Sequence, residues 1–552
     1  YLLDDNGKRI SAFPAVLDVG SIISKALFPA LATLLTQRDA GLSDALCNVV
    51  RDAFAVNMCD ENGKNTGNFE VEKYLYSVAE CSDYEKEQIY RNIPLQDYAA
   101  QVGEDHLYYF AYNSFGNNYD IVTELYAYIQ MVKAETGHDK VNIVPISMGG
   151  SVANGLFEYY PQVMDDLDKV VYIVPALNGS TIVGDLYTKN LAFFDTDFLY
   201  NGFLEALMDE EDARMIEVIA RILPDEVLTS VLRKAADCIV EEVAANITML
   251  WGLCPKEFYP AAAEALLADK PEIKRQTDMF YQAQLNSDAN IQRLVDNGVE
   301  VFDIVDYDVA MYLIGNSWND DNADGVIQLS STAMGVHSAL VGETLPEDYV
   351  QKNTYCDNPE HNHISPDRVV DASTGLLPDT TFYFDHQGHE QTARNDIIIK
   401  LATELLATDN IQSVYSTPDY PQFNVRRDAR GLKNNHLPNA KRALERTDLS
   451  AEDRTELEAA IAQAEEVLNT TAGVEGDIAN AEKRIKAILT KIGEYAPEEP
   501  EKEPSQFFTK TSLWLFKYFG TNGFSEYLFV GIGNVIRSVR FFLSNYIFGS
   551  VK

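Results

Sequence analysis

Over the first 430 residues, short apolar runs alternate with segments in which apolar residues recur at helical spacing. This alternation constrains the fold more than any other feature of the sequence. A strand that is buried on both faces appears as a continuous apolar run, and a helix between two such strands makes their pairing parallel. Six runs have this character: 14–19, 106–112, 140–146, 169–174, 299–305 and 381–385. The sequence therefore predicts an α/β domain over 1–430, with a mostly parallel central sheet covered by helices.

The clearest strand–helix repeat surrounds residue 140. Apolar residues recur at helical spacing over 119–136, and Gly137 follows them as a helix stop signal. A strand is expected over 140–146 and a helix from about Ser151. Between about 192 and 295 apolar residues continue to recur at helical spacing without a strand-like run, which predicts a helical insertion; under a hydrolase interpretation this insertion would be the lid.

The last quarter of the chain has a different composition. Residues 437–493 are rich in Ala, Glu, Lys and Leu and predict a small helical hairpin or three-helix unit, with Ser450 and Asp453 matching a capping box. Residues 494–506 combine Pro with Glu and predict an extended linker. In 507–552, aromatic residues alternate with Lys and Arg, which predicts contact with a membrane surface or a protein partner.

Charge and cysteine content narrow the possible partners. The 44 basic and 85 acidic residues leave a net charge of -41, which argues against a nucleic-acid partner. The six cysteines lack C-x-x-C spacing, so we expect one or two disulfides, with no metal and no cofactor. The chain begins with Tyr rather than Met, which indicates either a processed protein or a recombinantly expressed form, and removal of a signal peptide would explain it.

Ser147 is the candidate nucleophile. It follows the predicted strand 140–146 and precedes Gly149 and Gly150, which leave room for a sharp turn into a helix. Pro145 occupies the position where a G-x-S-x-G pattern has its first glycine, and its ring is compatible with the extended end of a strand. We therefore expect a nucleophile elbow at Ser147.

A serine nucleophile needs a general base, and the chain has eight histidines. His389 is placed best, because it lies between the strand-like run 381–385 and an apolar helical pattern. His386, three residues earlier, is the alternative. His361 and His363, with Cys356 and Asp357, could form a metal site, but a polar surface loop is the favoured interpretation.

The acid of such a triad lies between Ser and His in the chain order of α/β-hydrolases. Asp324 meets this order in a tight loop after the run 299–305, and Asp306 and Asp308 are fallbacks. The loop from Asp320 partly matches a calcium-binding pattern. Its twelfth position is Ser331 rather than Glu, so an independent calcium site is not favoured.

An oxyanion hole requires two N–H donors beside the nucleophile. The first is expected from Met148, the residue after Ser147. The second is expected from Gly20 or Ser21, because the run 14–19 is followed there by small residues.

The segments 139–150 and 323–330 resemble the lipase branch of the α/β-hydrolases, and lecithin:cholesterol acyltransferase-like lipases in particular. The resemblance covers about residues 12–410 and implies Ser147, Asp324 and His389 as a catalytic triad. Lipases of this kind carry the catalytic His six residues before an Asn that opens the last helix, and His389 stands six residues before Asn395.

The chain departs from this family in two places. Pro145 replaces a glycine of the elbow, and the segment Asp18-Val19-Gly20 lacks the usual His-Gly pair of the oxyanion loop. The unit 437–493 is similar to small repeats of secreted Gram-positive surface proteins, which implies a secreted or surface-associated bacterial protein.

The expected function is hydrolysis of carboxylic esters, with a hydrophobic or lipid ester as substrate. Acyl transfer, phospholipid deacylation and amide hydrolysis on the same triad remain open, because the sequence does not separate them. A surface binding protein with an inactive hydrolase domain is the alternative from a different class.

Overall fold

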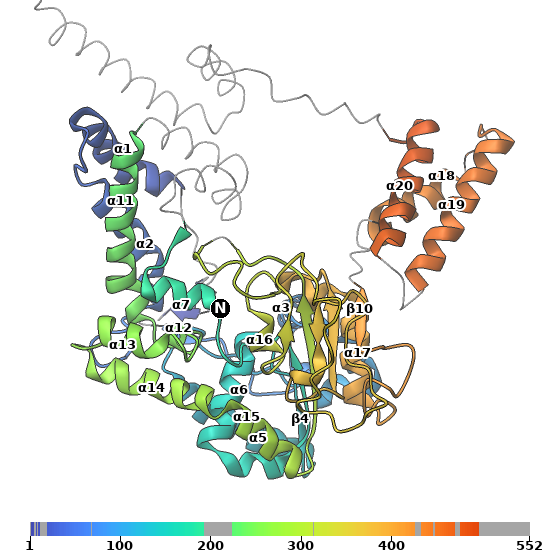
Figure 1. Cartoon of the computed structure of the whole chain (residues 1–552), viewed down its shortest axis with the longest axis horizontal. Helices are drawn as coiled ribbons and strands as arrows, with labels where there is room; N and C mark the ends of the chain where they lie inside the picture. Colours follow the sequence, from blue (N-terminus) through green and yellow to red (C-terminus); the bar gives the residue numbers. More distant parts are fainter. Residues whose placement is uncertain are drawn as a thin grey trace, which may run out of the picture.

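The computed structural model describes residues 2–4, 7, 9–10, 19–67, 69–192, 223–312, 314–425, 432–444, 446, 448–469 and 475–495. These residues form a mixed α/β protein around a parallel sheet of five strands, in the order β10-β9-β6-β5-β4 (Figure 1). The strands are β4 (Val141–Ile143), β5 (Leu167–Ile173), β6 (Glu300–Tyr307), β9 (Thr381–Asp385) and β10 (Phe423–Val425).

Two smaller sheets accompany the central one. β1 (Leu2–Asp4) pairs antiparallel with both β2 (Arg9–Ile10) and β3 (Phe69–Val71). β7 (His337–Ser338) pairs antiparallel with β8 (Val370–Asp371) and closes a long excursion of the chain between β6 and β9.

Four of the six predicted strands are confirmed, those over 140–146, 169–174, 299–305 and 381–385. The strand predicted over 106–112 is wrong. His106 ends a 3-10 helix, and the carbonyl oxygens of Leu107 and Tyr109 accept hydrogen bonds from the Val78 amide (2.8 Å) and the Tyr128 hydroxyl (3.2 Å) instead of a neighbouring strand. The run 14–19 lies mostly outside the described residues, and its last residue opens a helix.

Helices cover both faces of the sheet, because β5 is apolar on both of its sides. Val170 and Tyr172 pack with helices α5 (Asn118–Thr136), α6 (Met148–Tyr159) and α15 (Ser287–Asp296). Val171 and Ile173, on the opposite face, pack with α17 (Asp396–Ala407). The predicted stop of α5 is confirmed: Gly137 caps the helix with a left-handed φ of 70°.

The predicted insertion at 192–295 is helical wherever it is described, and residues 193–222 lie outside the description. Its helices are α11 (Asp225–Cys238), α12 (Thr248–Trp251), α13 (Tyr259–Leu266), α14 (Pro271–Leu285) and α15. α14 packs on α6, and α15 packs on α6 and β6. These last two helices are therefore the crossover between β5 and β6, and they belong to the α/β core rather than to an inserted lid.

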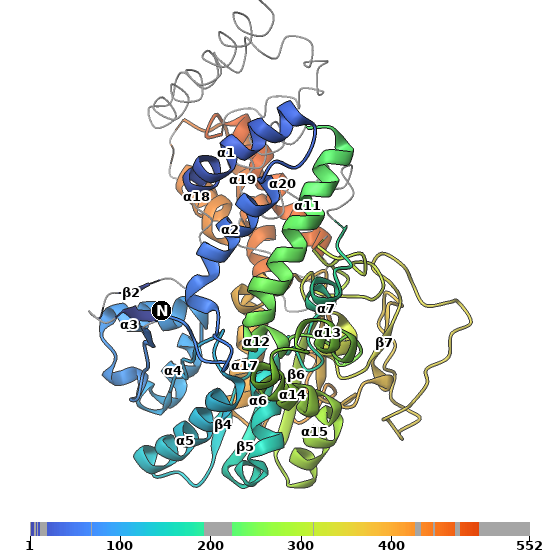
Figure 2. The same cartoon turned by 90° about the vertical axis from the view of Figure 1, so that its left-hand side faces the viewer.

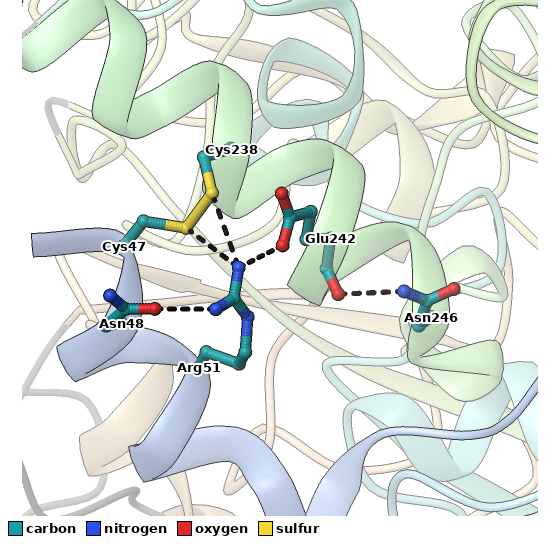
Figure 3. The surroundings of a disulfide bond; sticks show 6 residues. All are labelled: Cys47, Asn48, Arg51, Cys238, Glu242 and Asn246. Atoms are coloured by element: carbon teal, nitrogen blue, oxygen red, sulfur yellow. Dashed lines mark hydrogen bonds and ion pairs between the residues drawn. A yellow bond between two sulfur atoms is a disulfide. The ribbon is translucent and has the colours of Figure 1, made fainter. Parts of the chain in front are cut away.

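Three helices form an arm that stands away from the sheet (Figure 2). α2 (Leu42–Phe54) packs against both α1 (Val19–Thr36) and α11. A disulfide joins Cys47 of α2 to Cys238, the last residue of α11, across 191 positions of sequence. Arg51 lies beside both sulfur atoms and forms an ion pair with Glu242 (Figure 3).

This disulfide is the one bond between cysteines in the described part of the chain, which includes all six of them. Cys59, Cys81, Cys254 and Cys356 are free and buried. The expectation of one or two disulfides is therefore met by the single pair.

We expect the double variant Cys47→Ala/Cys238→Ala to lower the free energy of unfolding by about 2–4 kcal/mol, because the bond closes a long loop in the unfolded chain. Urea unfolding of the wild type with and without reductant measures the effect. Reductant is expected to destabilise the wild type by a similar amount and to leave the double variant unchanged. Equal stability of the oxidised wild type and the double variant would contradict the expectation.

The C-terminal region forms a separate three-helix core. α18 (Leu437–Ala443), α19 (Ala451–Asn469) and α20 (Glu475–Lys491) bury one apolar cluster between them, which confirms helices over 437–493. The amide of Asp453 donates to the Ser450 hydroxyl at 3.0 Å, as the capping pattern predicts. The linker from residue 496 and the aromatic segment 507–552 lie outside the described residues.

The remaining helices are short or peripheral. They are α3 (Asp83–Asn92), α4 (Gln96–Val102), α7 (Thr181–Thr188) and α16 (Leu329–Thr332). Among the residues that the structure describes, none of the helices combines the length and apolar character needed to span a membrane.

Candidate active site

Ser147 occupies a strained turn between β4 and α6. Its backbone has φ 52° and ψ -119°, a conformation that residues with a side chain rarely adopt. Two backbone hydrogen bonds fix it: the Ser147 amide donates to Ile173 O (3.0 Å), and the Ala176 amide donates to Ser147 O (2.9 Å). The end of β5 thus holds the turn that presents the Ser147 side chain.

Pro145 is hydrogen-bonded into the sheet just before the turn. The Pro145 carbonyl accepts a hydrogen bond from the Ile173 amide at 3.1 Å, so the residue joins the sheet through the one backbone polar group that proline retains. A Cβ atom at Gly149 would lie 3.9 Å from the Pro145 Cβ, which is ordinary contact. The close approach is at Gly150, where a Cβ would meet the Pro175 Cβ at 2.5 Å and its Cα at 2.9 Å.

We therefore expect Gly150→Ala to destabilise the protein by about 1–3 kcal/mol, because the new methyl group overlaps the backbone of Pro175. Gly149→Ala is the matched control and is expected to change stability by less than about 0.5 kcal/mol, since the site is open. Thermal unfolding of both variants measures the difference. Equal melting temperatures would contradict the predicted overlap.

His389 lies directly beside Ser147. It opens the short 3-10 helix His389–Arg394 after β9, and its Nε2 atom is 2.8 Å from Ser147 Oγ. The following helix, α17, begins at Asp396 and is N-capped by Asn395, whose side chain accepts a hydrogen bond from the Ile397 amide (2.9 Å). Sequence analysis therefore placed His389 correctly in a strand-to-helix loop.

Asp324 completes a hydrogen-bonded chain of three side chains. Its Oδ2 atom lies 2.6 Å from His389 Nδ1, and its Oδ1 atom accepts from the amides of Val326 (2.9 Å) and Ile327 (2.7 Å). The carboxylate is almost fully buried, at 1% exposure. A backbone bond from the His389 amide to Asp324 O (2.8 Å) joins the two loops as well.

The charge balance around His389 suits a base. Burial disfavours the imidazolium form, but the adjacent Asp324 carboxylate outweighs burial, so the pKa of His389 is raised above its ordinary value of 6.5. With Nδ1–H donated to Asp324, the lone pair of Nε2 points at Ser147 Oγ. The three groups can therefore take a proton from the serine hydroxyl and hold it on the ring.

The fallback residues lie elsewhere. His386, half exposed, contacts Asp385 and Asp308, with its Nε2 atom 3.3 Å from Asp308 Oδ2. Asp306 is fully buried and accepts a hydrogen bond from the Thr392 hydroxyl, which steadies the 3-10 helix that begins at His389. The structure thus brings together Ser147, His389 and Asp324 from the predicted set, and none of the fallbacks.

Of the residues predicted for the oxyanion hole, Met148 lies beside the candidate nucleophile, and Gly20 and Ser21 do not. Met148 is the first residue of α6, where backbone N–H groups have no acceptor within the helix. Gly20 and Ser21 instead lie in α1, on the arm that both views show apart from α6 (Figures 1 and 2). The prediction for them is wrong, because the chain there is a helix at the arm and not a loop at a strand end.

A different loop follows residues that share a hydrophobic cluster with Met148. Phe110 and Tyr112 pack against the same cluster as Met148, and the turn 113–116 follows them directly. The Asn113 side chain holds this turn by accepting from the Phe115 amide at 3.1 Å. The sequence analysis missed this loop. It interpreted 106–112 as a strand and placed the oxyanion loop after the apolar run near the N-terminus, where a glycine follows.

Two residues of the partial calcium pattern, Asn322 and Asp324, have side-chain oxygen atoms engaged in hydrogen bonds. Asn322 Oδ1 accepts from the Asp308 amide (2.7 Å), and both carboxylate oxygens of Asp324 accept from His389 and from backbone amides. The loop therefore serves to position the Asp324 carboxylate.

Comparison with known proteins returned no family model, no curated protein and no solved structure that matches this chain. The interpretation of the site rests on its own geometry.

Proposed function

We propose that this protein is a secreted serine hydrolase with an α/β-hydrolase fold, which cleaves carboxylic esters through Ser147. The observation that carries the proposal is the chain from Ser147 Oγ through His389 to Asp324, with contacts of 2.8 and 2.6 Å, built on a strained turn. Strained backbone of this kind persists where the surrounding structure enforces it, as at nucleophile elbows.

The proposed reaction has two halves. His389 Nε2 takes the Ser147 proton as the oxygen attacks the acyl carbon, and the imidazolium then protonates the departing alcohol, leaving an acyl group on Ser147. Water repeats the sequence, with His389 again as base, and releases the acid. Asp324, held by the amides of Val326 and Ile327, fixes the ring tautomer and stabilises its positive charge.

The tetrahedral intermediates need donors for their oxyanion. The Met148 amide supplies one at the first turn of α6, where the helix dipole also favours negative charge. The second comes, in this proposal, from the turn 113–116, because the residues before it pack with Met148.

The surroundings of Ser147 favour an apolar acyl group. Met148, Phe110 and Tyr112 are half-buried and pack in one cluster, and the two rings stack with centroids 5.7 Å apart. Partly accessible apolar surface beside a nucleophile favours a hydrophobic substrate. The disulfide Cys47–Cys238 supports secretion, because such bonds persist in oxidising compartments.

Labelling with a fluorophosphonate probe tests the proposal. The folded wild type is expected to gain one adduct, located at Ser147 by peptide mass spectrometry, and Ser147→Ala is expected to gain none. Ser151→Ala is the matched control one turn along α6. Its hydroxyl donates to Gly252 O at 3.0 Å, and that carbonyl keeps a second donor in Gln284 (2.9 Å), so the control should fold and label normally.

The informative negative result is a wild type that is folded by circular dichroism and yet unlabelled. That result would favour a binding protein with an inactive hydrolase domain. Labelling of Ser147→Ala equal to that of the wild type would place the reactive group elsewhere.

A further inference from the structure

Four metal-binding side chains converge near the start of β9, outside the candidate active site. Cys356, His361 and His363 come from the long loop 339–369 between β7 and β8, and Asp379 lies two residues before β9. One ligand atom from each lies within 4.8 Å of the others. Sequence analysis had considered the first three with Asp357 and preferred a surface loop, but the fold brings in Asp379 instead.

The separations between these atoms suit one small cation. His361 Nδ1 lies 3.6 Å from Cys356 Sγ and 3.0 Å from Asp379 Oδ1, and His363 Nε2 lies 3.4 Å from the same oxygen. At the bond lengths usual for zinc, tetrahedral coordination separates N and O ligands by about 3.3 Å and N and S ligands by about 3.5 Å. Small side-chain adjustments therefore convert this cluster into a tetrahedral site.

A second set of contacts orients His363 as a ligand. Its Nδ1 atom is 2.9 Å from Gln422 Oε1, and the Gln422 amide nitrogen donates to Pro378 O at 2.6 Å. This contact orients the Gln422 side chain so that its oxygen accepts a hydrogen bond from His363. The His363 ring therefore carries its proton on Nδ1 and directs the lone pair of Nε2 toward the cluster. Such a partner on the other ring nitrogen is typical of metal-bound histidine.

The cluster is buried on one side. The His363 side chain has 0% exposure and Cys356 is buried, and the Tyr415 ring packs against His361 with centroids 4.2 Å apart, while Asp379 is 45% exposed on the other side. The loop 339–369 contains no helix and no strand longer than a single bridge, and separate hydrogen bonds, such as that from the Lys352 amide to Asp371 Oδ2 (2.9 Å), tie it to β8. A cation at this point would fasten the loop to the start of β9 in the central sheet.

We infer that Cys356, His361, His363 and Asp379 bind a structural zinc ion. One thiolate, two imidazoles and one carboxylate form a ligand set that zinc prefers, and four protein ligands close its coordination shell. The site lies before β9, and His389 lies after it, so the ion stands at the opposite end of the strand from the candidate triad. Its role is to hold the loop, independent of the reaction proposed for Ser147.

Metal analysis of the untagged full chain tests the inference. Protein prepared with zinc and dialysed is expected to retain one zinc per chain, and Cys356→Ser and His363→Ala are expected to lose it. Cys81→Ser, another buried free thiol, and His337→Ala, in β7 beside the same loop, are the matched controls and should retain the ion. Gln422→Ala keeps all four ligands and is expected to weaken zinc affinity by about 10–100-fold.

Two measurements on the wild type keep the test decisive if a ligand variant does not fold. Protein stripped by a chelator and titrated with Co²⁺ is expected to show thiolate-to-cobalt charge transfer and the strong visible absorption of tetrahedral cobalt. Stripping is also expected to increase proteolytic cleavage within 339–369, and added zinc should reverse it. A wild type without stoichiometric zinc and without the cobalt absorption would overturn the inference, as would zinc retained at full affinity by Cys356→Ser and His363→Ala.

Discussion

Ser147→Ala and His389→Ala are each expected to lower kcat for an activated ester by about 10⁵–10⁶-fold, and the double variant is expected to lose no more than either one. The reason is that in the proposed mechanism Ser147 Oγ and His389 Nε2, which lie 2.8 Å apart, perform one step together: the oxygen attacks only as the ring takes its proton. Once either group is absent, the other has no function left to lose. Steady-state hydrolysis of p-nitrophenyl esters measures all three variants.

His386→Ala is the control for this comparison. It removes an imidazole three positions from His389 whose contacts are Asp385 and Asp308, so activity within a few-fold of the wild type is expected. If the loss of kcat in the Ser147→Ala/His389→Ala double variant equals the product of the two single losses, the two residues act independently. A large loss in His386→Ala would move the base to that residue.

The central strands could be predicted because their residues are buried on both faces and leave a continuous apolar signal. β6 and β9 are such runs, and the sequence located both within two residues. β10 gave no comparable signal, since it is three residues long and contains Asn424. The strand predicted over 14–19 has the opposite problem, because the run is apolar and yet its last residue begins a helix. That helix, α1, packs against α2 on the arm.

The triad could be predicted where chain order and local pattern agreed. Ser147 had strand, glycines and helix around it, and His389 had a strand before and an N-capped helix after. The choice of Asp324 over Asp306 depended on family resemblance and chain order. The structure adds a physical reason, because Asp306 is engaged by Thr392, whereas Asp324 lies in a loop whose amides leave one oxygen for His389.

The proposed zinc site could not be predicted in full from local sequence patterns. Cys356, His361 and His363 are close in sequence and were noticed, but their fourth partner lies 18 residues after His361, beyond β8. Gln422, which orients His363, lies 59 residues after it, just before β10. Contacts of this range depend on which strands are neighbours in the sheet, and the sequence contains no local record of that order.

Asp324→Asn is expected to lower kcat by about 10⁴-fold and also to shift the pH dependence of the remaining activity. Burial disfavours a charged His389, and the Asp324 carboxylate outweighs burial and raises the pKa of the ring above 6.5. In the proposed mechanism the ring accepts a proton only when it is neutral, so wild-type activity should fall on acidification with a midpoint above that value. In the variant the burial remains and the carboxylate charge is gone, so the midpoint should move to lower pH.

The rate and the midpoint together separate this role from a merely structural one. A variant that is damaged in folding loses activity at every pH without moving the acid limb of kcat/KM, whereas loss of the carboxylate moves the limb in a stated direction. Asp308→Asn is the matched control: its carboxylate contacts His386 and the Gly342 amide, so its acid limb should coincide with that of the wild type. If Asp324→Asn retains the wild-type midpoint, the Asp324 charge does not act on the base, and the acid of the triad must be sought elsewhere.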